Sequence, residues 1–434
     1  MLKTCLFATK FNIFCNEMLC LVGGLCIYSV LQYVKISCKG GKKMNNKKSG
    51  SEDTRMKDTD KTVRAVSKDV QGARKHYLDN IRWMTVVLVV IYHVFYMYNA
   101  EGVLGGLGKI TNLDVQYYDV YQYIVYPWFM PILFIVSGIS SRYYLDRHTE
   151  KEFVKSRTTK LLVPSTIGLL VFQFIQGYVS MSISDAFATM GQVPKPVLYL
   201  IMVLSGLGVL WYIQLLWVLS LILLLTRRLE KERLWELGGR ANIVTLVLMV
   251  IPVWGAAQIL NTPVITVYRI GLYGMVFLLG YYVFSHDEVI EVLKKWFVLL
   301  LVVAVVLGAA FCVKYFGDNF ADVPVNRTPL YAAYCWFACL AILGGMARYG
   351  DFENAFTAWM NKRSFGLYVF HYLGISSVAL FLGKPGNVSA PVVYLLSLVA
   401  GFAVGYILNE IISRLPFFRW AVLGIKVKKE MRQS

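Results

Sequence analysis

The sequence has little charge for its length. Of its 434 residues only 16% are Asp, Glu, Lys or Arg, whereas 57% are hydrophobic. A soluble domain of this size does not need that much apolar surface. Repeated windows of about twenty apolar residues are long enough to cross the hydrocarbon core of a bilayer as helices. The composition therefore excludes an ordinary soluble enzyme and predicts an all-α, polytopic membrane protein.

Paired cysteine motifs are also missing. The chain has eight cysteines, but none of them forms a CxxC motif. Cys312, Cys335 and Cys339 fall in apolar segments, where cysteine usually behaves as a small buried hydrophobic residue. We therefore predict no disulfide framework, no metal site and no permanently bound cofactor.

The net charge of +18 does not indicate nucleic acid. The lysines and arginines cluster between apolar runs, which is the pattern of orientation charge rather than of a nucleic-acid-binding stripe. No inverted repeat of the kind expected for a secondary transporter is evident either. The expected partner of these segments is the lipid bilayer.

Ten apolar segments are predicted to span the membrane. They are approximately residues 79–98, 117–140, 161–183, 207–226, 242–260, 264–285, 295–316, 329–347, 364–382 and 391–412. Residues 185–206 fit the start of a long fourth helix, a loop or a re-entrant segment.

The connections between these segments alternate in charge. Sixteen basic residues fall on one side, namely Arg142, Arg147, Lys151, Lys155, Arg157, Lys160, Arg227, Arg228, Lys231, Arg233, Arg240, Lys294, Lys295, Arg348, Lys362 and Arg363. Five fall on the other, namely Lys109, Lys195, Lys314, Arg327 and Lys384. Positive loops stay in the cytoplasm, so this asymmetry predicts that both termini are cytoplasmic.

Three segments flank the membrane domain, two before it and one after it. Lys39-Gly40-Gly41 can be encoded by a ribosome-binding sequence upstream of Met44, so residues 1–43 are expected to be a mis-annotated leader or else an extra anchor helix. Residues 44–75 are polar and mixed in charge, which is typical of a disordered cytoplasmic tail. Residues 76–413 form the membrane domain, and 414–434 are predicted to be a basic cytoplasmic tail.

The first span carries the most informative pair of residues. Arg82 and His93 are eleven positions apart, and eleven steps of about 100° bring a helix back to within about 20° of its starting direction. The two side chains therefore share one face, separated by roughly 16 Å along the axis. Asp79 lies within pairing distance of Arg82. An arginine near a helix end is ordinarily a snorkelling residue, but an ionisable histidine at mid-depth is a functional candidate.

Other polar residues in apolar runs are candidates to line a cavity with His93. Ser137 follows Pro127 and Pro131, which are expected to kink the second span. The remaining cavity candidates are Trp211, Tyr212, Arg269, and, in the ninth span, His371 with Ser364 and Tyr368. The alternatives are a packing kink for the two prolines, interfacial packing for Trp211 and Tyr212, and snorkelling for Arg269. The other histidines, His76, His148 and His286, are expected to be solvated.

Several of these motifs together resemble a known family. RKHYLDNIRWMTVVLVVIYH, FMPILFIVSG, KSRTTKLLVP, LWYIQLLW and SFGLYVFH occur in order between residue 74 and about residue 412. The chain is identified by them as a member of integral-membrane acyltransferase family 3. Trp211-Tyr212 stands where the family usually has an aromatic pair such as WF. The extracytoplasmic hydrolase-like domain of some members is missing, which makes this chain similar to stand-alone polysaccharide O-acyltransferases and glucan succinyltransferases.

The resemblance implies transfer of an acyl group from cytoplasmic acyl-CoA to a hydroxyl of an extracytoplasmic or lipid-linked glycan, in the plasma membrane of a bacterium. His93 would then be a general base or carry the acyl group itself. Arg82 would hold the CoA pyrophosphate or pair with Asp79, and Arg142, Lys155, Arg157 and Lys160 would add cytoplasmic charge for CoA. The main alternative is a proton-coupled transporter of a glycan or small solute, in which the same Arg and His form the binding site.

Overall fold

A computed structural model describes residues 74–98, 105–111, 119–261, 268–321 and 323–425. The chain divides into two units, Met1–Arg74 and Lys75–Ser434, and only the second contains described helices. The expectations for 1–43 and for nearly all of 44–75 therefore lie outside the described residues. In the described part no strand forms, and one isolated bridge joins Asn261 to Arg269. The chain is an all-α polytopic membrane protein.

Eight described helical stretches are long and apolar enough to cross a membrane. They are α3 (His76–Met97), α4 (Val120–Leu145), the continuous stretch Glu150–Ile183, the stretch Gly208–Glu230 that contains α9 (Trp211–Glu230), α14 (Asp287–Tyr315), α15 (Pro329–Tyr349), the stretch Ala355–Gly383 that begins with α16 (Ala355–Val378), and α17 (Ala390–Arg414). Each matches one of the ten expected spans.

The fifth and sixth expected spans form shorter helices than predicted among the described residues, which do not include 264–267 at the start of the sixth. The fifth is the pair α11 (Ile243–Leu248) and α12 (Val250–Ala256), and the sixth is α13 (Ile270–Tyr282). Pro252 explains the break in the fifth, because its ring clashes with the carbonyl of Leu248 four residues earlier. The remaining short helices are α8 (Lys195–Ser205), α10 (Arg233–Gly238) and α18 (Pro416–Leu423). Thus the end of 185–206 is a helix, packed on the adjacent stretch. Part of the expected basic tail is also a helix, α18, which packs on α6 (Val163–Gly168).

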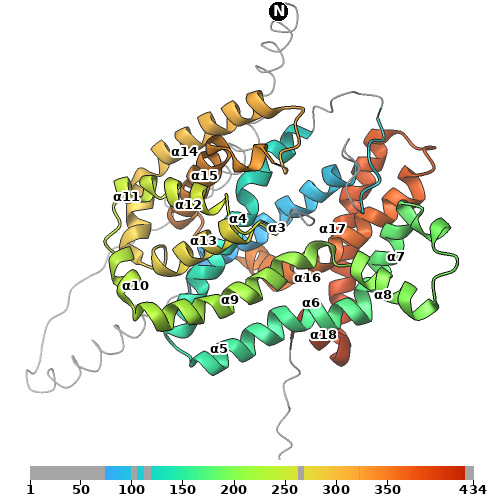
Figure 1. The fold of residues 1–434 in the computed structure, drawn as a ribbon, viewed down its shortest axis with the longest axis horizontal. Coiled ribbons are helices and arrows are strands. Elements are labelled where there is room, and N and C mark those ends of the chain that lie inside the picture. The colour runs from blue at the N-terminus through green and yellow to red at the C-terminus, as the bar shows by residue number, and fades with distance from the viewer. Residues whose placement is uncertain (1–73, 99–104, 112–118, 262–267, 322, 426–434) are drawn as a thin grey trace, which may run out of the picture. The chain divides into compact units, whose positions relative to one another are not determined.

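Helix α4 is the centre of the bundle (Figure 1). It packs against α3, α13, α14 and α15, and it continues through both internal prolines rather than breaking. Its contact with α13 is close, since a Cβ on Gly138 would clash with the carbonyl oxygen of Phe277 and one on Gly280 with that of Ile135. The backbones of α4 and α13 are thereby held close together.

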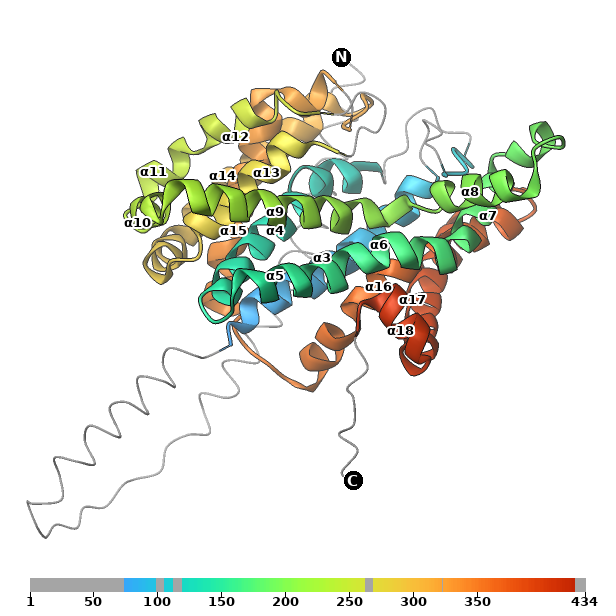
Figure 2. The same cartoon turned by 60° about the horizontal axis from the view of Figure 1, so that its bottom comes forward.

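The Glu150–Ile183 stretch runs beside α9 across one face (Figures 1 and 2). It consists of α5 (Glu150–Arg157), α6 (Val163–Gly168) and α7 (Phe174–Ile183), joined by wider π-helical turns at Thr158–Leu162 and Leu169–Gln173. Such turns frequently occur at functional sites. The first of them directly follows Arg157.

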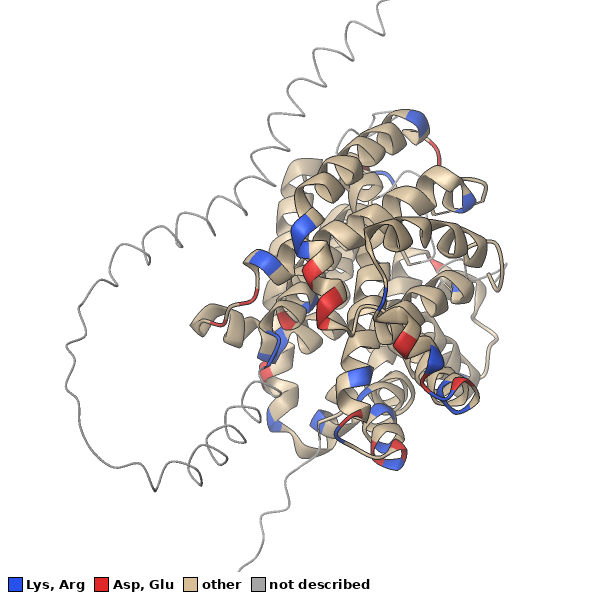
Figure 3. Cartoon of the chain, turned by 90° about the vertical axis from the view of Figure 1, so that its left-hand side faces the viewer, with Lys and Arg blue, Asp and Glu red and all other residues tan. Residues whose placement is uncertain are grey.

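Charged residues lie mainly at helix ends and in connections, as Figure 3 shows for the side where α5 begins. At this side Arg142 binds Glu232 and Asp146, and Arg227 also binds Glu232. Partial burial alone would raise the pKa of Glu232, but the two arginines outweigh this and lower it. This ion network joins the end of α4 to the connection between α9 and α10.

Candidate active site

Two histidines that are 278 positions apart meet in the bundle. Nε2 of His371 on α16 lies 3.1 Å from Nδ1 of His93 on α3, and the ring centroids are 4.9 Å apart. His371 is completely buried. The sequence placed both in one cavity as a hypothesis, and the structure brings the two rings into direct contact.

Backbone carbonyls decide which ring nitrogens carry hydrogen. Nδ1 of His93 is 2.8 Å from the carbonyl oxygen of Val89, and Nδ1 of His371 is 2.9 Å from that of Tyr368. A carbonyl can only accept, so both Nδ1 atoms carry the hydrogen and both neutral rings have a free lone pair on Nε2. His371 therefore accepts from Nδ1 of His93, which shares its hydrogen with Val89. His93 keeps an unprotonated Nε2.

Aromatic rings surround the histidine pair. Tyr92, Tyr96 and Tyr372 each lie with their centroids between 5.2 and 5.8 Å from that of His93. Tyr372 also donates to the carbonyl of Gly105, in the segment that follows α3. The His93 ring is thus fixed by packing on several sides as well as by its two hydrogen-bond contacts.

The other expected residues of α16 do not orient His371 through their hydroxyl groups. Ser364 donates to the carbonyl of Asn361 in its own helix, at 3.3 Å, and Tyr368 donates to the carbonyl of Val209. His371 is held instead by the carbonyls of Leu367 and Tyr368. The physical reason is that backbone carbonyls of the preceding turn lie nearer the ring than side chains on the same face.

The cavity candidates of α4 and α9 do come together. Ser137 and Tyr212 share a hydrogen bond of 3.0 Å, and Trp211 packs edge-on against Tyr212. Tyr212 in turn lies 6.1 Å, centroid to centroid, from Tyr368. An aromatic wall therefore leads from α9 to the helix that carries His371.

Arg82 lies near the start of α3, and His93 lies near its other end. Arg82 donates to Asp79 at 2.6 Å and to Ser140 of α4. The next serine, Ser141, accepts from Arg157 at 2.8 Å. The two guanidinium groups are close enough to repel each other, and Lys160 lies within range of both. This basic cluster of Arg82, Arg157 and Lys160 has Asp79 as its paired carboxylate among the described residues.

Two of the other basic candidates differ from this cluster. Arg142 is engaged by Glu232 and Asp146 and lies 4.0 Å from the centre of the Trp235 ring, whereas Lys155 is exposed on α5. His286, expected to be solvated, is buried, because it stacks on Trp235 and contacts its carbonyl oxygen at 2.9 Å. The expectation that His286 is solvated came from its position at the edge of a loop, and that position does not reveal that the ring stacks on Trp235.

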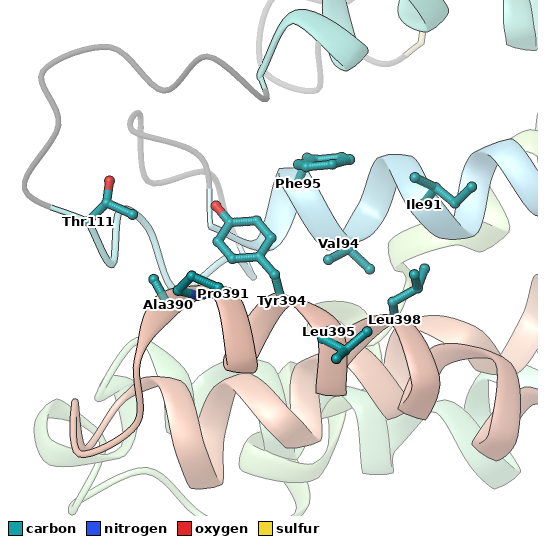
Figure 4. Close-up of a pocket in the computed structure, with 9 residues that line it drawn as sticks. All are labelled: Ile91, Val94, Phe95, Thr111, Ala390, Pro391, Tyr394, Leu395 and Leu398. Atoms are coloured by element: carbon teal, nitrogen blue, oxygen red, sulfur yellow. The ribbon is translucent and has the colours of Figure 1, made fainter. Parts of the chain in front are cut away.

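An apolar cavity of about 440 Å³ lies between α3 and α17 (Figure 4). Its lining includes Ile91 and Phe95 of α3, which point away from the His93 side of that helix, and Leu395 and Leu398 of α17. No histidine, acid or basic side chain lines it. The polar side chains in its lining are those of Thr111 and Tyr394, so the candidate active site remains the histidine pair.

The sequence matches the model of a known protein family. The family model for an acyltransferase domain matches residues 75–410, which is more than half of the chain. The chain belongs to acyltransferase family 3. It is therefore a membrane acyltransferase. Separate comparisons with curated proteins and with solved structures found no match.

Proposed function

We propose that this membrane acyltransferase moves an acetyl or succinyl group from cytoplasmic acyl-CoA to a hydroxyl of a cell-envelope glycan or lipid-linked sugar. The observation that carries the proposal is the contact between His93 and His371, which leaves a lone pair on Nε2 of His93. A neutral imidazole held in one tautomer is suited to remove a proton from a hydroxyl group. The bacterial plasma membrane is the expected location.

The proposed step is a direct transfer. Nε2 of His93 takes the hydroxyl proton while the acceptor oxygen attacks the thioester carbonyl. The C–S bond then breaks, and the thiolate of CoA takes the proton back from His93, which regenerates the neutral ring. His371 accepts from Nδ1 throughout, so it stabilises the imidazolium that forms. If His93 carries the acyl group instead, the same nitrogen attacks the thioester, the C–S bond breaks and CoA leaves as the thiolate. The acceptor oxygen then takes the acyl group from the acyl-imidazolium, the hydroxyl proton passes to the thiolate, and the neutral ring is regenerated.

The donor is expected to approach from the basic cluster. Arg157 has no carboxylate partner among the described residues and is held by Ser141, and planar guanidinium groups match phosphate oxygens well. Arg82 shares its charge with Asp79. We therefore assign Arg157 and Lys160, with Arg82, to the phosphates of CoA in preference to Arg142, whose charge is already neutralised.

Inside-out vesicles that contain the full-length protein test this function. Acetyl-CoA and succinyl-CoA, each labelled in the acyl group, are added outside, and base-labile label in glycan is measured. The proposal expects label from at least one donor and none in vesicles without the protein. No label from either donor would contradict it. A short incubation without acceptor, followed by a search for label on the protein, separates direct transfer from an acyl-His93 intermediate.

A further inference from the structure

Arg269 is a buried arginine outside the histidine pair and the basic cluster. It lies just before α13, and only 2% of its surface is exposed. Among the described residues its guanidinium donates to two tyrosine hydroxyls, at 2.6 Å to Tyr331 and 3.5 Å to Tyr273. The rings of Tyr126, Tyr273 and Tyr331 lie with their centres 5.0 to 5.6 Å from its guanidinium carbon. Three helices therefore build one aromatic cage around a cation.

The cage does not neutralise the charge. Nε and Nη1 of Arg269 are buried without a hydrogen-bond partner, and no ion pair to Arg269 forms within the described residues. By contrast, Arg142 and Arg363 bind carboxylates. Phenol rings attract a cation, but desolvating an unpaired charge costs several kcal/mol, more than such contacts return. Nε–H and the N–H groups of Nη1 lie on different edges of the guanidinium, so each is a free donor that can bind one oxygen of an oxyanion.

The position of the cage relates it to the proposed reaction. Tyr126 of the cage and Ser140 of the basic cluster are fourteen residues apart on the continuous helix α4, which separates them by about 21 Å. Tyr126 also stacks on Tyr92, with 5.9 Å between centroids, and Tyr92 precedes His93 in the chain. The cage therefore lies toward the other side of His93 from the CoA-binding cluster, where the acceptor is expected.

We propose that Arg269, with Tyr126, Tyr273 and Tyr331, binds an oxyanion of the acceptor, either a sugar carboxylate or a sugar phosphate. The inference rests on the proposed function for the identity of the acceptor, but not for anion binding itself. It assigns to Arg269 the recognition of an acidic acceptor, while His93 acts on the hydroxyl group.

Binding is measured without any acyl donor, so that a failure of acyl transfer and a failure of this inference can be told apart. The purified full-length protein in detergent is heated with increasing glucuronate, glucose 1-phosphate or neutral glucose at constant ionic strength. The midpoint concentration of the stabilising shift gives the affinity. Arg269→Gln removes the charge, and Arg327→Gln is a matched control, because Arg327 is a partly exposed arginine of the neighbouring turn before α15.

The expected result is stabilisation of the wild type by glucuronate, by glucose 1-phosphate or by both, and no shift with glucose. The responding probe identifies the acceptor group as carboxylate or phosphate. Arg269→Gln should weaken binding roughly 30-fold or more, while Arg327→Gln should bind as the wild type does. Arg269→Lys keeps the charge without the planar fork and should weaken binding by a smaller factor.

Three outcomes would overturn the proposal. The first is a wild type that responds to neither anion, a result that needs no variant to fold. The second is an equal response to glucose, and the third is undiminished anion binding by Arg269→Gln and Arg269→Lys.

Discussion

Replacing His371 by two different residues separates its orienting role from a packing role. His371→Ala removes the acceptor for Nδ1–H of His93, whereas His371→Gln provides a side-chain oxygen that accepts the same hydrogen bond. The contact is 3.1 Å long, joins neutral groups and is fully buried on the His371 side. Losing such a bond costs about 1–3 kcal/mol, which corresponds to a rate loss of about 5- to 150-fold for His371→Ala.

The assay is acyl transfer in inside-out vesicles, normalised to the amount of folded protein in the membrane. We expect His371→Gln to recover much of the rate that His371→Ala loses, with KM for acyl-CoA similar in both. Packing alone predicts no such rescue, since Gln fills the space of the imidazole ring poorly. Equal rates for wild type and His371→Ala would refute the hydrogen-bond reasoning, and equal losses in both variants would refute the orienting role.

Three further predictions concern donor binding, pH and topology. Arg157→Gln should raise KM for acyl-CoA about tenfold with little change in kcat, whereas Arg142→Gln should lower thermal stability instead; the reverse pattern in steady-state kinetics and melting would reject the assignment. Because the pKa of Glu232 is lowered in the folded state, its ion pairs stabilise the protein above its ordinary pKa of 4.5 and cease to do so as the pH falls through the folded value. Thermal unfolding should therefore show Glu232→Gln less stable than wild type at pH 7 but not in strong acid, and an equal deficit at both pH values would contradict this. Reporter fusions should place Ser434 in the cytoplasm and residues 101–114 outside, and the opposite result at either site would overturn the predicted orientation.

The local part of the site could be predicted from the sequence, because it depends on helix periodicity alone. The spacing of Arg82 and His93 and the proximity of Asp79 follow from 3.6 residues per turn, and α3 is continuous across all three positions. Hydropathy likewise located the eight long helical stretches. It overestimated the fifth, because a hydropathy window averages over Pro252 and does not register a broken helix. In the sixth, α13 ends at Tyr282, before the expected end at residue 285.

Contacts between distant segments could not be predicted in the same way. The sequence suggested that His93 and His371 share a cavity, but not that Nε2 of one meets Nδ1 of the other, since this depends on how α3 and α16 pack. The same holds for Arg269, whose tyrosine partners come from three helices. The number and position of tyrosines in an apolar run do not reveal which of them face a common cation.

The most direct test of the central claim is the rate of acyl transfer by His93→Ala, beside His148→Ala as a control that removes an exposed histidine. Both variants should insert in normal amounts, since His93→Ala relieves the desolvation cost of an ionisable group within the bundle and His148 is exposed. If Nε2 of His93 is the base, His93→Ala should lose about 10²–10⁴-fold in rate, and more if the residue carries the acyl group, while His148→Ala keeps its activity. Acylation of glycan by His93→Ala at the wild-type rate would contradict the account.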